Sequence, residues 1–157
     1  MENRELIKVC KLGGKFFKPS IVSNFTNKEI LPNYDQGQKT LYVVSAMEDV
    51  TRQILEKIFE SKYSQNLHRE IKEKNIERLT GEFYDKHTNL IHGLFFENPS
   101  GWKNFNEVYE SLVRHIIDPG KKYWTEDEIY ASILQHGELA SSKILSDYLS
   151  FRGIHNK

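Results

Sequence analysis

Residues 40–48 read TLYVVSAME, and this stretch decides the fold class of the chain. Its first five residues are nearly all apolar and rich in β-branched side chains. Such a run is typical of a strand buried on both faces, as in a parallel sheet covered by helices. Beyond Glu48 the apolar residues take helical spacing, with one face formed by Val50, Ile54, Leu55, Ile58 and Phe59. A buried strand that leads into a helix predicts an α/β domain.

A second strand is predicted upstream of this one. Residues 6–11 read LIKVCK, which is a short β-rich run, and they stop at the glycine pair Gly13-Gly14. We expect residues 6–11 and 41–45 to be parallel neighbours. The connection between them contains prolines and several asparagines, and we expect one short helix or turn there, around residues 20–28.

The rest of the chain is predicted to be helical. Apolar residues recur at helical spacing in residues 66–96 and again in residues 104–117. The sequence does not decide whether the first of these stretches is one helix or two helices divided at Gly81. The last helix begins at a capping box in residues 125–128 and ends at Gly153. Its apolar face consists of Ile129, Ile133, Leu134, Ala140, Ile144, Leu145 and Tyr148. Two parallel strands are not an independent architecture, so the chain is either a helix-dominated mixed domain or the front part of a larger α/β protein.

The composition argues against several classes of protein. The 157 residues include 22 Lys plus Arg and 22 Asp plus Glu, and a net charge of zero does not suit a general binder of nucleic acid or anionic membranes. A hydrophobic fraction of 38% with 2 Trp, 8 Tyr and 9 Phe is enough for one core, so disorder is a poor interpretation. The single cysteine, Cys10, cannot form an internal disulfide, and the histidines contain no HExxH pattern, so no metal site is expected. Since neither a signal-like segment nor an apolar run of about 18 residues occurs, we expect a soluble, cytoplasmic protein.

The first motif that could carry chemistry is Lys11-Leu12-Gly13-Gly14, directly after the first strand. Two glycines allow main-chain N–H groups to approach a phosphate, and the lysine adds positive charge. The spacing of a Walker A loop, GxxxxGK[ST], is absent. The alternative interpretation is a pair of glycines in an ordinary turn.

Two more motifs lie at the start of a helix and inside one. Ser45 ends the second strand, where ligands of open α/β folds collect, although Ser45 and Glu48 could equally form a capping box. Gly137-Glu138 lies inside the last helix, where a glycine costs about 1 kcal/mol relative to alanine. A ligand could explain this glycine, and so could close helix packing beside a solvated glutamate.

Taken in order, these motifs resemble those of the aspartate kinases, in the amino-acid kinase superfamily. The matching motifs are Lys-x-Gly-Gly after the first strand, Val-Val-Ser-Ala ending the second, and His-Gly-Glu-Leu-x-Ser in the last helix. Residues 144–149 and the pair Gly153-Ile154 match as well. The separation of 138 − 45 = 93 positions between Ser45 and Glu138 favours this branch over the acetylglutamate, glutamate and uridylate kinases.

The resemblance implies a fold and a domain organisation. Residues 1–157 would be the N-terminal part of a three-layer sandwich, in which a parallel sheet is covered by helices, with a helix-rich insertion at about 62–124. The C-terminal nucleotide-binding half and the regulatory domains would lie outside this chain. We therefore expect the 157-residue chain to be inactive on its own, and a homo-oligomer of the full-length form stays open.

The resemblance also implies an activity. Aspartate kinases transfer a phosphoryl group from ATP, with Mg²⁺, to the side-chain carboxylate of L-aspartate, which gives 4-phospho-L-aspartate, the first step toward lysine, threonine and methionine. The implied residues are Lys11, Gly13 and Gly14 for the ATP phosphates, and Ser45, Thr51 and Glu138 for aspartate. The lysine would be the catalytic residue, the two hydroxyls would hold the α-carboxylate of aspartate, and the glutamate would pair with its α-ammonium group.

Departures from the family pattern keep two other functions open. Lys15 and Phe16 stand where the family usually has small hydroxyl residues, and Glu48 or Asp49 stands where it has a glycine. A carboxylate near a phosphate would repel it, and Lys15 could compensate electrostatically. The first alternative is a catalytically inactive kinase-like fragment that serves as a binding or assembly module. The second is a helical interaction protein in which all the motifs are accidental.

Overall fold

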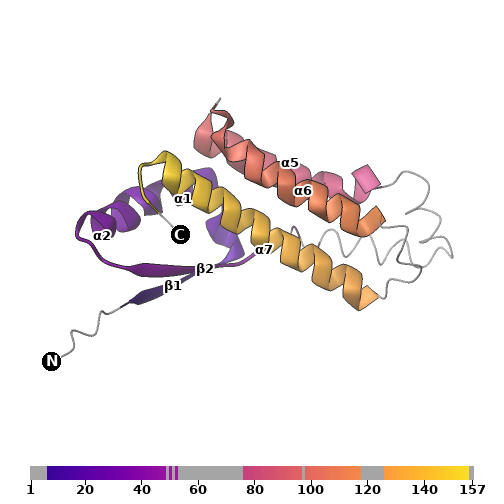
Figure 1. Cartoon of the computed structure of the whole chain (residues 1–157), viewed down its shortest axis with the longest axis horizontal. Coiled ribbons are helices and arrows are strands. Elements are labelled where there is room, and N and C mark those ends of the chain that lie inside the picture. The colour runs from indigo at the N-terminus through magenta and orange to yellow at the C-terminus, as the bar shows by residue number, and fades with distance from the viewer. Residues whose placement is uncertain are drawn as a thin grey trace.

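The computed structural model describes residues 7–48, 50, 52, 76–96, 98–117 and 126–155. In chain order its elements are the strand β1 (Lys8–Leu12), the helix α1 (Pro19–Phe25), a π-helical turn (Thr26–Ile30), the helix α2 (Leu31–Asp35), the strand β2 (Thr40–Val44) and the helices α5 (Ile76–Phe95), α6 (Trp102–Ile117) and α7 (Glu126–Phe151). Two 3-10 turns, Gly14–Phe16 and Pro99–Gly101, follow β1 and precede α6. Figure 1 shows α5, α6 and α7 packed along one another, with the small sheet beneath the C-terminal half of α7.

The two strands are parallel neighbours, which confirms the prediction for residues 6–11 and 41–45. The register pairs Lys8 with Thr40 and Leu12 with Val44. Parallel pairing requires a long crossover between the strands, and the helical segment from Pro19 to Asp35 supplies it.

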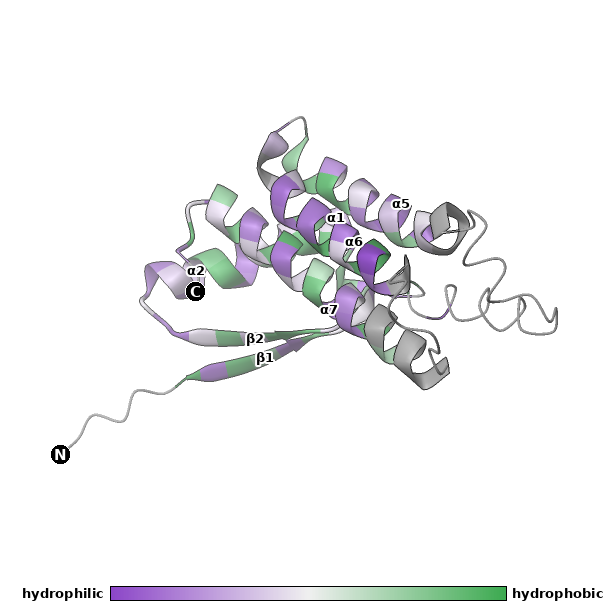
Figure 2. Ribbon diagram, turned by 45° about the vertical axis from the view of Figure 1, so that its right-hand side comes forward, coloured by the Kyte–Doolittle hydropathy of each residue, from purple (hydrophilic) through white to green (hydrophobic). Residues whose placement is uncertain are grey.

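The sheet is covered by helices on one face only, within the part of the chain that the structure describes. The side chains that face the helices are buried or half-buried, and they belong to Cys10, Leu12, Tyr42 and Val44. On the other face, Val9, Leu41 and Val43 are 64%, 56% and 47% exposed. Figure 2 shows the helices on the same side of the two strands. The expectation of a strand buried on both faces is therefore wrong for the described residues, because their helices all pack on one face.

The helical structure between the strands is longer than expected. Instead of a short helix near residues 20–28, the chain is helical from Pro19 through the π-helical turn to Asp35. Pro32 does not end this stretch because it lies in the first turn of α2, where the missing N–H is tolerated. Val22 and Ile30 fix the segment to the core, since both are buried.

The three long helices share one core, as their periodicity predicted. One face of α5 is buried, at the helical spacing that the sequence shows, through Phe83, His87, Leu90, Ile91 and Leu94. It meets Phe105, Val108 and Leu112 of α6 and Ala140, Ile144, Leu145 and Tyr148 of α7. The helix α5 continues without interruption through Gly81, so the break left open at this glycine does not occur.

His87 is the most deeply buried histidine of the described residues. His87 is fully buried, with its ring 4.3 Å from that of Phe83 and 5.5 Å from that of Phe105. Its Nδ1 donates to the backbone oxygen of Phe83 at 2.7 Å, and its Nε2 has no partner among the described atoms. Burial lowers the pKa of His87 to about 4.

The C-terminus of α7 has the cap that the sequence predicts. Gly153 has a φ of 76°, and the N–H of Ile154 donates to the oxygen of Leu149 at 2.9 Å. Arg152 donates to Tyr148 and to Asn27 of the π-helical turn, at 2.9 and 2.6 Å. The end of α7 is thereby joined to the segment that connects the strands.

Some sequence predictions lie outside the described residues. They are most of the helix that follows Glu48, the segment 66–75, the insertion boundaries near 62 and 124, and Thr125 of the capping box. What the structure describes is an α/β fold that is mostly helical, with a small parallel sheet. No helix in this part of the chain is long and apolar enough to cross a membrane.

Candidate functional site

The loop after β1 and the loop after β2 pack against each other at the carboxyl edge of the sheet. The N–H of Ser45 donates to the oxygen of Leu12 at 3.0 Å. A Cβ atom on Gly14 would lie 2.6 Å from the oxygen of Ala46 and 2.7 Å from the nitrogen of Glu48. These distances are too short for any side chain, so position 14 requires glycine for packing alone.

Gly13 differs from its neighbour. It is exposed, a Cβ atom there would meet nothing within 4 Å, and its φ of −77° is open to any residue. Neither packing nor backbone conformation therefore accounts for glycine at position 13. What glycine does offer there is a main-chain N–H that another molecule can approach closely.

An ion pair joins the two loops through the residues that depart from the family pattern. Lys15 Nζ lies 3.3 Å from Glu48 Oε1, and these side chains are 83% and 43% exposed. Lys86 of α5 donates to the backbone oxygen of Glu48 at 3.3 Å. At this exposure the pair contributes little to stability, but it places positive charge beside the Glu48 carboxylate. The sequence already showed Lys15 and Glu48 as departures from the family pattern. Only the contact between the two loops shows that these residues form an ion pair.

Lys11 lies on the face of the sheet that the described helices leave open. It is exposed and alternates with Cys10 and Leu12, which face the helices. Its register partner is Val43, on the same open face. Two residues later the chain reaches Gly13, so Lys11 is near the carboxyl edge of the sheet but is not part of the contact between the loops.

Glu138 lies on α7, which packs on the face of the sheet opposite to Lys11. Ser142, one helical turn after it, lines a groove beside β2, and at the other end of that groove the N–H of His155 donates to Tyr34 Oη at 3.4 Å. Since Tyr34 precedes β2, α7 runs antiparallel to β2, as Figure 2 shows. Glu138 is exposed and lies about 6 Å beyond Ser142 along the axis, toward the end of β2 where Ser45 follows. No hydrogen bond joins Glu138 to Ser45, and Thr51 lies outside the described residues.

The residues before Glu138 pack against α6. Gly137 is buried, and the buried His136 lies 3.3 Å from Ser111 Oγ through its Nε2. The interpretation of this glycine as a helix-packing residue is thus supported. It does not exclude a ligand at Glu138, because the two residues point to different sides of α7.

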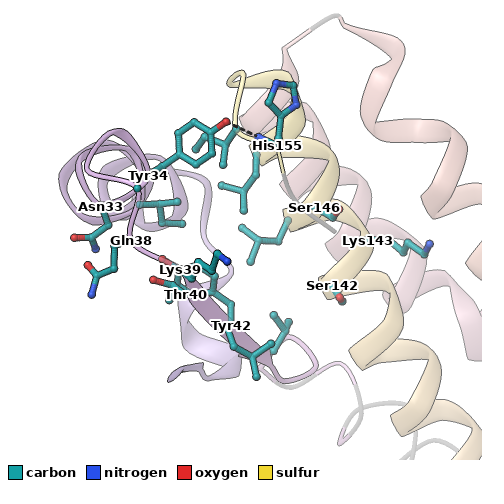
Figure 3. A pocket seen from close by; sticks show the side chains of 17 residues that line it. Asn33, Tyr34, Gln38, Lys39, Thr40, Tyr42, Ser142, Lys143, Ser146 and His155 are labelled. Atoms are coloured by element: carbon teal, nitrogen blue, oxygen red, sulfur yellow. Dashed lines mark hydrogen bonds between the residues drawn. The ribbon is translucent and has the colours of Figure 1, made fainter. Parts of the chain in front are cut away.

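The sequence did not predict the groove beside β2. It measures about 820 Å³ and lies between α7 on one side and α2 and β2 on the other (Figure 3). Tyr42 forms part of its wall, and burial raises the pKa of this phenol. The groove lies along one edge of β2. The sequence does not show which strand lies at the edge of a sheet, because this depends on which strands pair.

Metal ligands do not gather in the described part of the chain. No group of three His, Cys, Asp or Glu side chains there could hold an ion. The carboxylate beside the glycine loop, Glu48, is already paired with Lys15. The described residues therefore do not fit a protein-held Mg²⁺, and we assign none of them to it.

No protein-family model matches the chain, and no curated protein is significantly similar to it. The aspartate kinase resemblance accordingly depends on the motifs and on their arrangement.

Proposed function

We propose that this chain carries the N-terminal part of an aspartate kinase, which phosphorylates the side-chain carboxylate of L-aspartate with ATP. A carboxylate oxygen attacks the γ-phosphorus, and the bond to the bridging oxygen breaks as ADP leaves. The carboxylate is ionised at neutral pH, with an ordinary pKa of about 3.9, so the reaction needs no general base. The protein must instead align two anions and neutralise the transferring group.

The observation that carries the proposal is the glycine at position 13. A solvent-facing glycine with an ordinary φ and free space around it has no structural cause in the described residues. A phosphate bound to the N–H groups of this loop would give it one, because a side chain there would obstruct the approach. Gly14 has a packing cause, so it supports the proposal less.

The other residues take roles around this loop. Lys11 neutralises charge on the phosphates, Ser45 and Thr51 hold the α-carboxylate of aspartate, and Glu138 pairs with its α-ammonium group. Mg²⁺ arrives with ATP, held by the phosphates. In this arrangement the substrates meet at the carboxyl edge of the sheet, where ligands of open parallel sheets bind. The finer fold, a three-layer sandwich with helices on both faces, is part of the same proposal.

The test compares alanine at the two glycines. Gly13→Ala should leave the melting temperature unchanged and weaken the binding of MgATP by about tenfold or more, measured by titration calorimetry. Gly14→Ala is the matched contrast and should lower stability by about 1–3 kcal/mol, because its Cβ meets backbone. If Gly13→Ala binds MgATP as the wild type does, the phosphate role of this loop is wrong.

A second candidate function is an inactive kinase-like binding module. The observation that favours it is the Lys15–Glu48 ion pair, which places a carboxylate beside the proposed phosphate loop. A coupled ADP assay on the longest natural form of the protein separates the two. Aspartate-dependent ADP release supports the kinase, whereas a folded protein without turnover and without MgATP binding supports the module.

A further inference from the structure

Three segments of the chain meet at Glu48, beside the glycine loop. Lys15 pairs with its carboxylate, and Lys86 of α5 donates to its backbone oxygen, each at 3.3 Å. Gly14 lies against the nitrogen of the same residue, since a Cβ atom on Gly14 would be 2.7 Å from it. The nitrogen and the oxygen of one residue are about 3 Å apart, so Lys86 Nζ lies within roughly 10 Å of Gly14. The helix α5 therefore brings a lysine to the glycine loop from a distant part of the sequence.

The ammonium group of Lys86 has no carboxylate partner in the part of the chain that the structure describes. It donates to a neutral backbone oxygen, while the carboxylate of Glu48 is paired with Lys15. Glu82, one turn earlier on α5, forms no ion pair with Lys86, and neither does the exposed Asp85. Lys86 is half-buried, and the flexible stem of a lysine lets its ammonium group move by several ångström. Its charge is thus available to an anion at the glycine loop.

The carboxyl edge of the sheet carries positive charge in a chain that is neutral overall. Residues 11–18 include three lysines and no acidic residue, whereas residues 45–49 include two acidic residues, Glu48 and Asp49. Together with Lys86, four lysines stand against two carboxylates, which is a net charge of +2. A polyphosphate requires this sign of charge. The lysine on α5 also offsets the repulsion that a carboxylate at position 48 would exert on a phosphate.

We propose that Lys86 is a further phosphate-binding residue, and that its ammonium group binds the polyphosphate chain of the nucleotide from the side of α5. The inference rests on the proposed function, and it extends that site from the ends of the two strands to the middle of a helix. When the nucleotide binds, Lys86 exchanges the neutral oxygen of Glu48 for a charged phosphate oxygen. The new hydrogen bond is the stronger one, because both of its groups are ionised.

The test measures the binding of inorganic tripolyphosphate and of MgATP to the wild-type chain and to variants, by titration calorimetry. Lys86→Met keeps most of the length of the side chain without its charge, and it should weaken the binding of both ligands by about tenfold. Lys103→Met removes the same charge from an exposed position of α6 and is the matched control. It should bind both ligands as the wild type does. Thermal unfolding checks that each variant is folded.

Lys86→Gln separates the charge of this residue from its contact with Glu48. Its side-chain amide can still donate to the Glu48 oxygen, so it would preserve binding if Lys86 merely held the loop in place. We expect Lys86→Gln to bind tripolyphosphate as weakly as Lys86→Met does. We also expect binding to both neutral variants to depend less on salt than binding to the wild type, because one charge interaction is lost.

The outcomes separate this inference from the proposed function. If the wild type binds MgATP and either neutral variant binds it equally well, Lys86 is not a phosphate-binding residue, and the kinase proposal stands. If the wild type binds tripolyphosphate through Lys86 but does not bind MgATP, the role of Lys86 is supported and the kinase proposal is contradicted. A folded wild-type chain that binds neither ligand contradicts both.

Discussion

Gly13 and Gly14 show that adjacent residues of one type can have different causes. Position 14 needs glycine because two loops approach each other there, and a Cβ atom would lie 2.6 Å from a backbone oxygen. Position 13 has space for any side chain. The sequence predicted a phosphate role for both glycines. The structure supplies a packing cause for Gly14 alone. The proposed phosphate role is therefore tested at Gly13, where packing does not require glycine.

The Lys15–Glu48 ion pair leads to a prediction about nucleotide binding. Lys15→Ala should weaken MgATP binding several-fold, because it leaves the Glu48 carboxylate unpaired beside the phosphates, while stability changes by less than about 1 kcal/mol. Glu48→Ala in the Lys15→Ala background should restore most of the affinity. Titration calorimetry on the double-mutant cycle checks this, with Lys103→Ala on α6 as control. A double variant as weak as Lys15→Ala would show that Lys15 contacts the phosphates itself.

His87 leads to a prediction about pH. The unfolded chain binds a proton at this residue near pH 6.5, and the folded chain does so only near pH 4. Between these values the unfolded state binds more protons, so stability is complete above pH 6.5 and falls as the pH drops toward 4. The loss from His87 amounts to at most about 3 kcal/mol. His87→Phe should lose this part of the pH dependence in urea unfolding.

The matched control for this measurement is His155→Gln, because His155 is exposed. That variant should keep the wild-type pH dependence. A His87→Phe protein whose stability falls between pH 6.5 and 4 as steeply as the wild type would contradict the assignment.

At the scale of elements, two glycines of the long helices should respond to alanine in opposite directions. Gly153 caps α7 with a φ of 76°, where a Cβ atom is strained, so Gly153→Ala should lower the free energy of unfolding by about 1–2 kcal/mol. Gly81 lies inside α5 with nothing within 4 Å of an added Cβ, so Gly81→Ala should raise it by about 0.5–1 kcal/mol. Chemical denaturation measures both. A stabilising Gly153→Ala would contradict the assigned cap.

Glu138 leads to a prediction about aspartate. Glu138→Gln removes the charge that would pair with the α-ammonium group, and it should weaken L-aspartate binding by about tenfold or more without changing MgATP binding. Glu107→Gln, at an exposed position of α6, is the control. Equal aspartate affinity in the wild type and in Glu138→Gln would remove this residue from the site.

Helices and strands were predictable here to the extent that periodicity determines them. The helix α5 is predictable from Phe83, Leu90 and Leu94, because the residues of a buried helix face recur at regular spacing along the sequence. The continuation of the helix through Pro32 was not predictable, because it depends on where the first turn of α2 begins. The sequence left open whether the helix breaks at Gly81. The helix continues because residues on both sides of this glycine pack into the core, and intrinsic helix propensity does not contain that information.

At the scale of the whole molecule, the sheet is the part that the sequence predicted least completely. The parallel pairing followed from composition, whereas the exposure of Val9, Leu41 and Val43 did not. An apolar strand sequence reports that both faces can be buried, but it does not report which segment covers them. The groove beside β2 and the pairing of Lys15 with Glu48 were missed for the same reason, since both depend on distant segments meeting.

The central claim is that the carboxyl edge of this sheet binds a nucleotide and aspartate. The most direct test is a ¹⁵N-NMR titration of the chain, which detects weak binding and locates it by residue. We predict that MgATP shifts the amide signals of Gly13 and Gly14, and that L-aspartate shifts those of Ser45 and Glu138, while succinate, which lacks the α-ammonium group, leaves Glu138 unchanged. A folded chain whose amides at these four positions respond to neither ligand would contradict the account.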